Sequence, residues 1–222
     1  MKRAVVVCDM WDSHHCVTAA RRVAEMAPAV NAFVSQLRRR DTLIIHAPGG
    51  CTGFYESTPA RDRARRAPFA AAPVPIDWNP WNWEREGKPP QTLVEPGPCS
   101  CESGPPCCSS EAGYPWTRQI ETIEIAPADA VSDDGQEVYN LLEEESVRDV
   151  VVLGVHANVC ILGRPYGIRQ LVYLRKRPVL CRDLTDSFHR DPRGHDWGTA
   201  EIVAHIERYW CPTVSSHELL AS

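Results

Sequence analysis

Cys160 lies where an apolar run gives way to a helical pattern, in the stretch VVVLGVHANVCILG (residues 150–163). A thiol in the first turn of a helix is favoured as the thiolate, because the helix dipole and the free backbone N–H groups stabilise its negative charge. The same N–H groups can hold an oxyanion during acyl transfer. Cys160 is therefore a candidate nucleophile, and a buried, inert thiol is the alternative interpretation.

Asp9 directly follows the first apolar run of the chain, RAVVVC (residues 3–8). A carboxylate beside a thiol can take the thiol proton, or it can activate the water that cleaves a thioester. The alternative role for a carboxylate at a strand end is to cap a turn. The catalytic interpretation thus requires a fold that brings Asp9 and Cys160 together.

Strand-like and helix-like segments alternate along the chain. Short apolar runs predict strands near residues 3–9, 42–48, 120–127, 147–155 and 177–183. Helical patterns occur at about 17–39, 135–145, 158–174 and 198–209. This alternation predicts an α/β fold: a doubly wound, mainly parallel sheet of about six strands with helices on both faces. In such sheets ligands bind beyond the carboxyl ends of the strands, where Asp9 and Cys160 would both lie.

The length of 222 residues suits a single domain, spanning 1–222. The segment from about 48 to 118 breaks the alternation, because it contains many prolines, tryptophans and cysteines. It is too long to be an ordinary connection between two elements of a compact domain. We interpret it as an insertion that emerges after the second strand, at the ligand-binding edge. It would serve as a lid or specificity loop, and a subunit contact or a surface excursion is the alternative.

The charge and hydropathy of the chain exclude several classes of partner. A formal net charge of -5 provides no basic field for nucleic acid. No apolar run approaches the roughly 20 residues of a membrane span, and the first residues, MKRAVVVCDMWD, lack the pattern of a signal peptide. We therefore expect a cytoplasmic protein without nucleic-acid or membrane partners. The thiol chemistry outlined above would act on a small-molecule substrate and needs no bound organic cofactor.

Three stretches resemble the isochorismatase-like cysteine hydrolases, a family that includes nicotinamidases and N-carbamoylsarcosine amidohydrolases. They are VVVCDMWD (5–12), VVVLGVHANVCILGRPYGIRQL (150–171) and RPVLCRDLTDS (177–187). The resemblance implies that Asp9 and Cys160 are catalytic. It also implies a homo-oligomer, and a cis peptide bond between Val155 and His156 that turns amides near Cys160 toward the oxyanion.

The sequence departs from this family at the third catalytic residue, a lysine at the end of the third strand. Ala126, Pro127 and Asp129 stand where that lysine is expected. Arg118, a little upstream, and His156, close to the thiol in sequence, are the candidates to supply positive charge instead.

The segment DMWDSHHC (residues 9–16) adds further candidates directly after the first strand. Its His14, His15 and Cys16 can bind substrate, move protons or take part in a metal site, and capping of the loop is the alternative. No catalytic metal is predicted. The residues expected to contact substrate are Trp11, His14, Arg118, His156 and Asn158.

Four further cysteines crowd into one Pro/Gly/Ser-rich stretch, at positions 99, 101, 107 and 108. Their number is sufficient for zinc, which takes four nitrogen or sulfur ligands, but their spacing is not a familiar C-x₂-C pair. Zinc, a disulfide and free thiols therefore all stay open.

The residues and the resemblance together favour a cysteine-dependent hydrolase of a small-molecule amide or related acyl C–N bond. Cys160 would form a thioester, and Asp9 would move the proton. The alternative is a binding or regulatory protein that keeps the pocket without turnover, because the expected lysine is absent.

Overall fold

The computed structural model describes residues 2–94, 97–102, 104–108 and 113–221. Its strands are β1 (Arg3–Cys8), β2 (Leu43–Ala47), β3 (Ala130–Val131), β4 (Asp149–Gly154), β5 (Arg177–Thr185) and β6 (Thr213–Val214). The main helices are α1 (Val17–Arg38), α5 (Gly135–Glu144), α6 (Ile168–Tyr173), α7 (His195–Tyr209) and α8 (Ser216–Ala221). A π-helical turn, η2 (Ala157–Ile161), follows β4.

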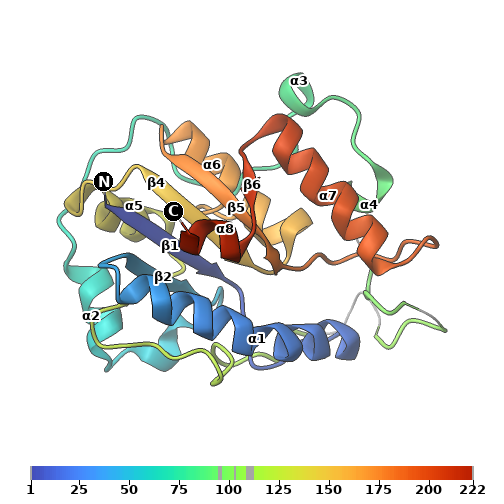
Figure 1. Cartoon of the computed structure of the whole chain (residues 1–222), viewed down its shortest axis with the longest axis horizontal. Coiled ribbons are helices and arrows are strands. Elements are labelled where there is room, and N and C mark those ends of the chain that lie inside the picture. Colours follow the sequence, from blue (N-terminus) through green and yellow to red (C-terminus); the bar gives the residue numbers. More distant parts are fainter. Residues whose placement is uncertain (1, 95–96, 103, 109–112, 222) are drawn as a thin grey trace.

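All six strands are parallel and lie in the order β3-β2-β1-β4-β5-β6. The helix α1 lies on one face of the sheet together with α8, whereas α5 and α6 lie on the other (Figure 1). The central strands β1 and β4 are almost wholly buried, which explains their unbroken runs of valine. The predicted doubly wound α/β architecture is confirmed.

The strand order reverses between β1 and β4. From β1 the chain runs outward to β2 and β3, and then it crosses back through α5 to β4 on the opposite side of β1. In open parallel sheets, ligands bind at this switch point beyond the carboxyl ends of the two strands. Asp9 and Cys160 follow these two strands.

The third strand is not where the sequence predicted it. Residues 120–127 form turns, and β3 consists of Ala130 and Val131, which pair with Ile45 and His46 of β2. The apolar pattern at 120–127 has another cause, because Ile123 is buried in the core while Glu121 and Glu124 are exposed.

The helix predicted at 158–174 is interrupted by a turn at residues 164–167. The Arg164 amide donates to the Cys160 carbonyl at 2.9 Å, and the Gly167 amide donates to the Arg164 carbonyl at 2.7 Å. Pro165 cannot continue the ladder of helical hydrogen bonds, and a Cβ on Gly167 would lie 2.7 Å from the Ile161 carbonyl oxygen. Arg164 is therefore the first residue after the helical residues that follow Cys160.

The long segment between β2 and β3 contains short helices rather than a structureless loop. They are η1 (Thr52–Tyr55), α2 (Pro59–Arg66), α3 (Trp83–Glu86) and α4 (Gln91–Val94). Glu86 of α3 is buried, and its carboxylate accepts hydrogen bonds from Arg169 and His205 at 2.8 Å each. These contacts attach the segment to α6 and α7. Across the described residues, no helix has the length and apolar character that crossing a membrane requires.

Candidate active site

Asp9 is completely buried at the end of β1 and has a positive φ of 50°. Aspartate is among the few residues that tolerate this left-handed conformation. Its amide donates to the Ala47 carbonyl at 3.0 Å, which extends the pairing with β2 by one residue. Its Oδ1 accepts a hydrogen bond of 2.6 Å from the Gly49 amide. The end of β2 thus holds both the backbone and the carboxylate of Asp9.

Cys160 lies in the turn η2, and its thiol lies close enough to the Asp9 carboxylate for each group to shift the pKa of the other. The backbone amide of His156 also contacts the sulfur. Cys160 is 6% exposed, and that exposed surface faces a pocket. The structure therefore brings together the two residues that the sequence singled out. The Val155–His156 peptide bond is cis, as the resemblance implied.

Arg164 supplies a cation beside this pair that sequence reasoning missed. Its Nε and Nη2 atoms both lie 3.1 Å from Oδ2 of Asp9. Gly49 makes room for this arrangement, since a Cβ there would lie 2.5 Å from Nη2 of Arg164 and 2.8 Å from Oδ1 of Asp9. Within the described residues, the lining of the pocket holds this arginine and no lysine.

Burial controls the pKa values of this group. Burial raises the pKa of Asp9 above its usual range, and Arg164 opposes that shift. Burial and the neighbouring Asp9 charge raise the pKa of Cys160 well above its usual range, although Arg164 lowers it. The expectation that the helix terminus lowers the pKa of Cys160 is therefore wrong. Burial therefore favours the neutral thiol at Cys160, whereas Arg164 favours the ionised form of Asp9 against the effect of burial.

The pocket has a volume of about 650 Å³ and is lined largely by aromatic rings. Trp11 and Trp116 stack with their ring centroids 4.1 Å apart, and the Trp11 indole N–H donates to the Gly49 carbonyl at 3.0 Å. Arg164 lies near the ring of Trp78, 5.9 Å from its centroid. The lining residues are Trp11, His14, His15, Gly49, Gly50, Trp78, Gly97, Pro98, Tyr114, Trp116, His156, Val159, Cys160, Arg164 and Phe188.

The two predicted substrate-binding histidines, His14 and His156, face this pocket. Burial lowers the pKa of His156 to about 4, and burial together with His156 lowers the pKa of His14 to about 2. Both imidazoles are neutral at pH 7. His156 therefore cannot supply the positive charge for which it was a candidate.

Two other predicted substrate contacts lie outside the pocket lining. Arg118 pairs with Glu121 at 2.6 Å and lies 4.0 Å from Asp12, so its charge is engaged on the surface rather than beside Cys160. Asn158 donates to the Phe188 carbonyl at 2.8 Å and accepts from the Phe188 amide at 2.9 Å. Asn158 thus positions the Phe188 ring of the pocket.

One of the predicted oxyanion residues is also engaged elsewhere. The Val155 amide donates to the Cys8 carbonyl at 3.0 Å, which continues the pairing of β4 with β1. The backbone of His156 instead interacts with the Cys160 thiol, whose pKa it lowers.

Three solved structures share this architecture. A cysteine hydrolase from Pseudomonas syringae pv. phaseolicola 1448A has a TM-score of 0.57 and 13% identity, over 99% of this chain and 91% of that chain. An isochorismatase family protein from Desulfovibrio vulgaris subsp. vulgaris str. Hildenborough has a TM-score of 0.55 and 16% identity, over 100% of this chain and 99% of that chain. An isochorismatase-like hydrolase from Alkaliphilus metalliredigens has a TM-score of 0.53 and 12% identity, over 99% of this chain and 95% of that chain.

No family model and no curated protein matches the sequence. At these low identities the three structures establish a shared fold. The chain therefore has the fold of the isochorismatase-like hydrolases.

Proposed function

We propose that this protein is a cysteine-dependent hydrolase that cleaves the acyl C–N bond of a small amide or a related acyl compound. The observation that carries the proposal is the buried contact of Cys160 with Asp9, and of Asp9 with Arg164, beside a pocket at the switch point of the sheet. This arrangement provides a nucleophile, a base and a fixed cation.

In the first half of the reaction, the Cys160 sulfur attacks the carbonyl carbon while Asp9 accepts the thiol proton. The amides of His156 and Cys160 hold the resulting oxyanion. Asp9 then gives the proton to the leaving nitrogen as the C–N bond breaks. Amine or ammonia departs, and the acyl group stays on Cys160 as a thioester.

In the second half, water attacks the thioester carbonyl and loses a proton to Asp9. The C–S bond breaks, the carboxylic acid leaves and the thiol regains a proton. Because the pKa of Asp9 is raised by burial, Asp9 is a stronger base than an exposed aspartate. Arg164 keeps this buried carboxylate ionised and oriented. It thereby supplies the positive charge that the absent lysine would have provided.

The lining of the pocket favours a substrate with a flat apolar part. The stacked indoles of Trp11 and Trp116 and the rings of Trp78, Tyr114 and Phe188 offer faces for an aromatic or conjugated group. The neutral imidazoles of His14 and His156 offer hydrogen bonds without charge. Homo-oligomerisation and a cytoplasmic location stay predictions from the sequence.

The proposal is tested by measuring ammonia release from primary amides of similar size that carry an aromatic, a heteroaromatic or an aliphatic group. We expect turnover, with kcat/KM at least about tenfold higher for ring-bearing amides, since well-placed apolar contacts are worth about 1–3 kcal/mol in specificity. Saturable binding of these amides in calorimetry without any ammonia release would favour the alternative, a binding or regulatory protein.

A further inference from the structure

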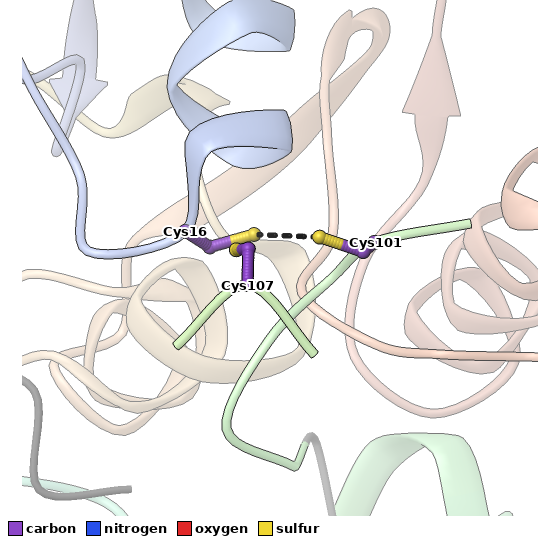
Figure 2. A group of neighbouring side chains, drawn as sticks. All are labelled: Cys16, Cys101 and Cys107. Atoms are coloured by element: carbon purple, nitrogen blue, oxygen red, sulfur yellow. Dashed lines mark hydrogen bonds between the residues drawn. The ribbon is translucent and has the colours of Figure 1, made fainter. Parts of the chain in front are cut away.

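A group of sulfur atoms lies outside the candidate active site, where the start of α1 meets the long segment. Cys16 directly precedes α1, and Cys101 and Cys107 come from the cysteine-rich stretch, so residues distant in sequence meet here (Figure 2). The sulfur atoms of these three cysteines all lie within 4.8 Å of one another. The separation between Cys16 and Cys101 is 3.9 Å.

These separations match the spacing of metal ligands. Sulfur atoms about 2.3 Å from a tetrahedral zinc ion are about 3.8 Å from one another. A disulfide would instead need an S–S distance of about 2.05 Å. The 3.9 Å between Cys16 and Cys101, and the 3.7 Å between Cys107 and its neighbour Cys108, are therefore close to an edge of a zinc tetrahedron.

Hydrogen-bond donors around the sulfurs favour thiolates. The Ser100 amide donates to the Cys16 sulfur at 3.3 Å, and the Thr18 hydroxyl donates to the Cys101 sulfur at 3.3 Å. The Cys16 side chain is completely buried, which makes an isolated thiolate costly at that position. A cation shared among the sulfurs would offset that cost, and donors to ligating sulfurs are a usual part of metal sites.

Two further thiols border the group and are the candidates for a fourth position. Cys99 packs with Cys16 and Cys101 in one buried cluster, and Cys108 packs against that cluster. Structural zinc sites are closed by four protein ligands, and four cysteines form a common set. The active-site Cys160 belongs to the main core instead.

We propose that Cys16, Cys101 and Cys107, with Cys99 or Cys108 as the fourth ligand, bind one structural zinc ion. The ion joins two walls of the pocket. Cys16 directly follows His14 and His15, and the cysteine-rich stretch directly follows Gly97 and Pro98, all of which line the pocket. The site thereby holds the long segment against α1 and is independent of the proposed hydrolysis.

The test uses the full chain without a polyhistidine tag, produced in zinc-supplemented cells and purified with a reducing agent and no chelator. We expect about one zinc per chain by elemental analysis. Cys107→Ser should lower this to below about 0.2 per chain, and Cys107 is exposed, so the substitution spares the core. The control is Cys181→Ser. The Cys181 thiol lies in β5 and contacts Asp183, away from the group of sulfurs, so this variant should keep the full zinc content.

A second measurement, cobalt substitution, identifies the ligands. The cobalt-loaded wild type should show the intense visible bands of a tetrahedral thiolate site, and Cys107→Ser should lose most of their intensity. The proposal is overturned if the wild type contains no zinc and gives no such bands with cobalt, or if Cys107→Ser keeps its full zinc. It is also overturned if peptide mapping shows Cys16 joined to Cys101 or Cys107 by a disulfide.

Discussion

Asp9→Asn is expected to lower kcat/KM on an amide substrate by about 10²- to 10⁴-fold, the usual contribution of a positioned general base. Asparagine keeps the shape of the side chain and can still accept from the Gly49 amide. It cannot take the proton from Cys160, protonate the leaving nitrogen or activate water. The loss should therefore appear in kcat, while the affinity for substrate changes little.

The same substitution should make Cys160 more reactive toward a simple alkylating agent. The Asp9 charge is one of the causes that raise the pKa of Cys160, and Arg164 lowers that pKa. When Asp9 becomes neutral and Arg164 remains, the pKa of Cys160 falls. The thiolate fraction at neutral pH then rises, and the pH profile of alkylation moves toward lower pH.

Peptide mass spectrometry after brief iodoacetamide treatment, from about pH 5 to about pH 9, measures the alkylation of Cys160, and ammonia release measures turnover. Asp12→Asn is the matched control, because the Asp12 carboxylate binds Thr117 instead. Its alkylation profile at Cys160 should equal that of the wild type. If Asp9→Asn kept full turnover, Asp9 would not be the base. If Asp9→Asn slowed the alkylation of Cys160, the Asp9 charge would not be what raises the pKa of that thiol.

Arg164→Gln is expected to lower kcat/KM by about tenfold to a hundredfold at neutral pH and to change its pH dependence. Arg164 lowers the pKa of Asp9 against the effect of burial. Without the guanidinium, the pKa of Asp9 rises further, by about one to three units for the loss of an adjacent opposite charge. Asp9 acts as a base only when ionised, so the acidic limb of the kcat/KM profile should move to higher pH.

Arg164→Lys is the control for charge, because lysine keeps the cation and loses the fork of two donors. It should restore most of the wild-type pH profile. A profile for Arg164→Gln that coincides with the wild type would show that the ion pair with Asp9 is not used in the reaction. Circular dichroism should accompany both variants, since removing one partner of a buried ion pair costs about 3–5 kcal/mol of stability.

Much of the fold was predictable because its signals are local. The valine-rich runs that became β1 and β4 predicted buried parallel strands, and the ends of those runs identified Asp9 and Cys160. The rule that ligands bind at the carboxyl ends of parallel strands then placed both residues at one edge. Trp11, His14 and His156 were predicted from their proximity in sequence to those strand ends, and they line the pocket.

The rest depends on features that hydrophobic periodicity does not record. The strand β3 has two residues, too few for a pattern, whereas the turn at 120–127 imitates a strand because it buries Ile123. Arg164 reaches Asp9 because of the turn at 164–167, and the one local signal for that turn was the sequence Arg-Pro-Tyr-Gly inside an expected helix. The contact of Cys16 with Cys101 spans 85 residues and leaves no local pattern.

The central claim is that an acyl group is carried on Cys160. It is tested most directly by quenching the reaction with acid during turnover of an active amide, digesting the protein and weighing the peptide that contains Cys160. The predicted result is the mass of the substrate acyl group on Cys160 in the wild type. Cys160→Ala should show neither the adduct nor ammonia release, and Cys51→Ala, which removes another buried thiol, should show both. Ammonia release that persists undiminished in Cys160→Ala would contradict the claim.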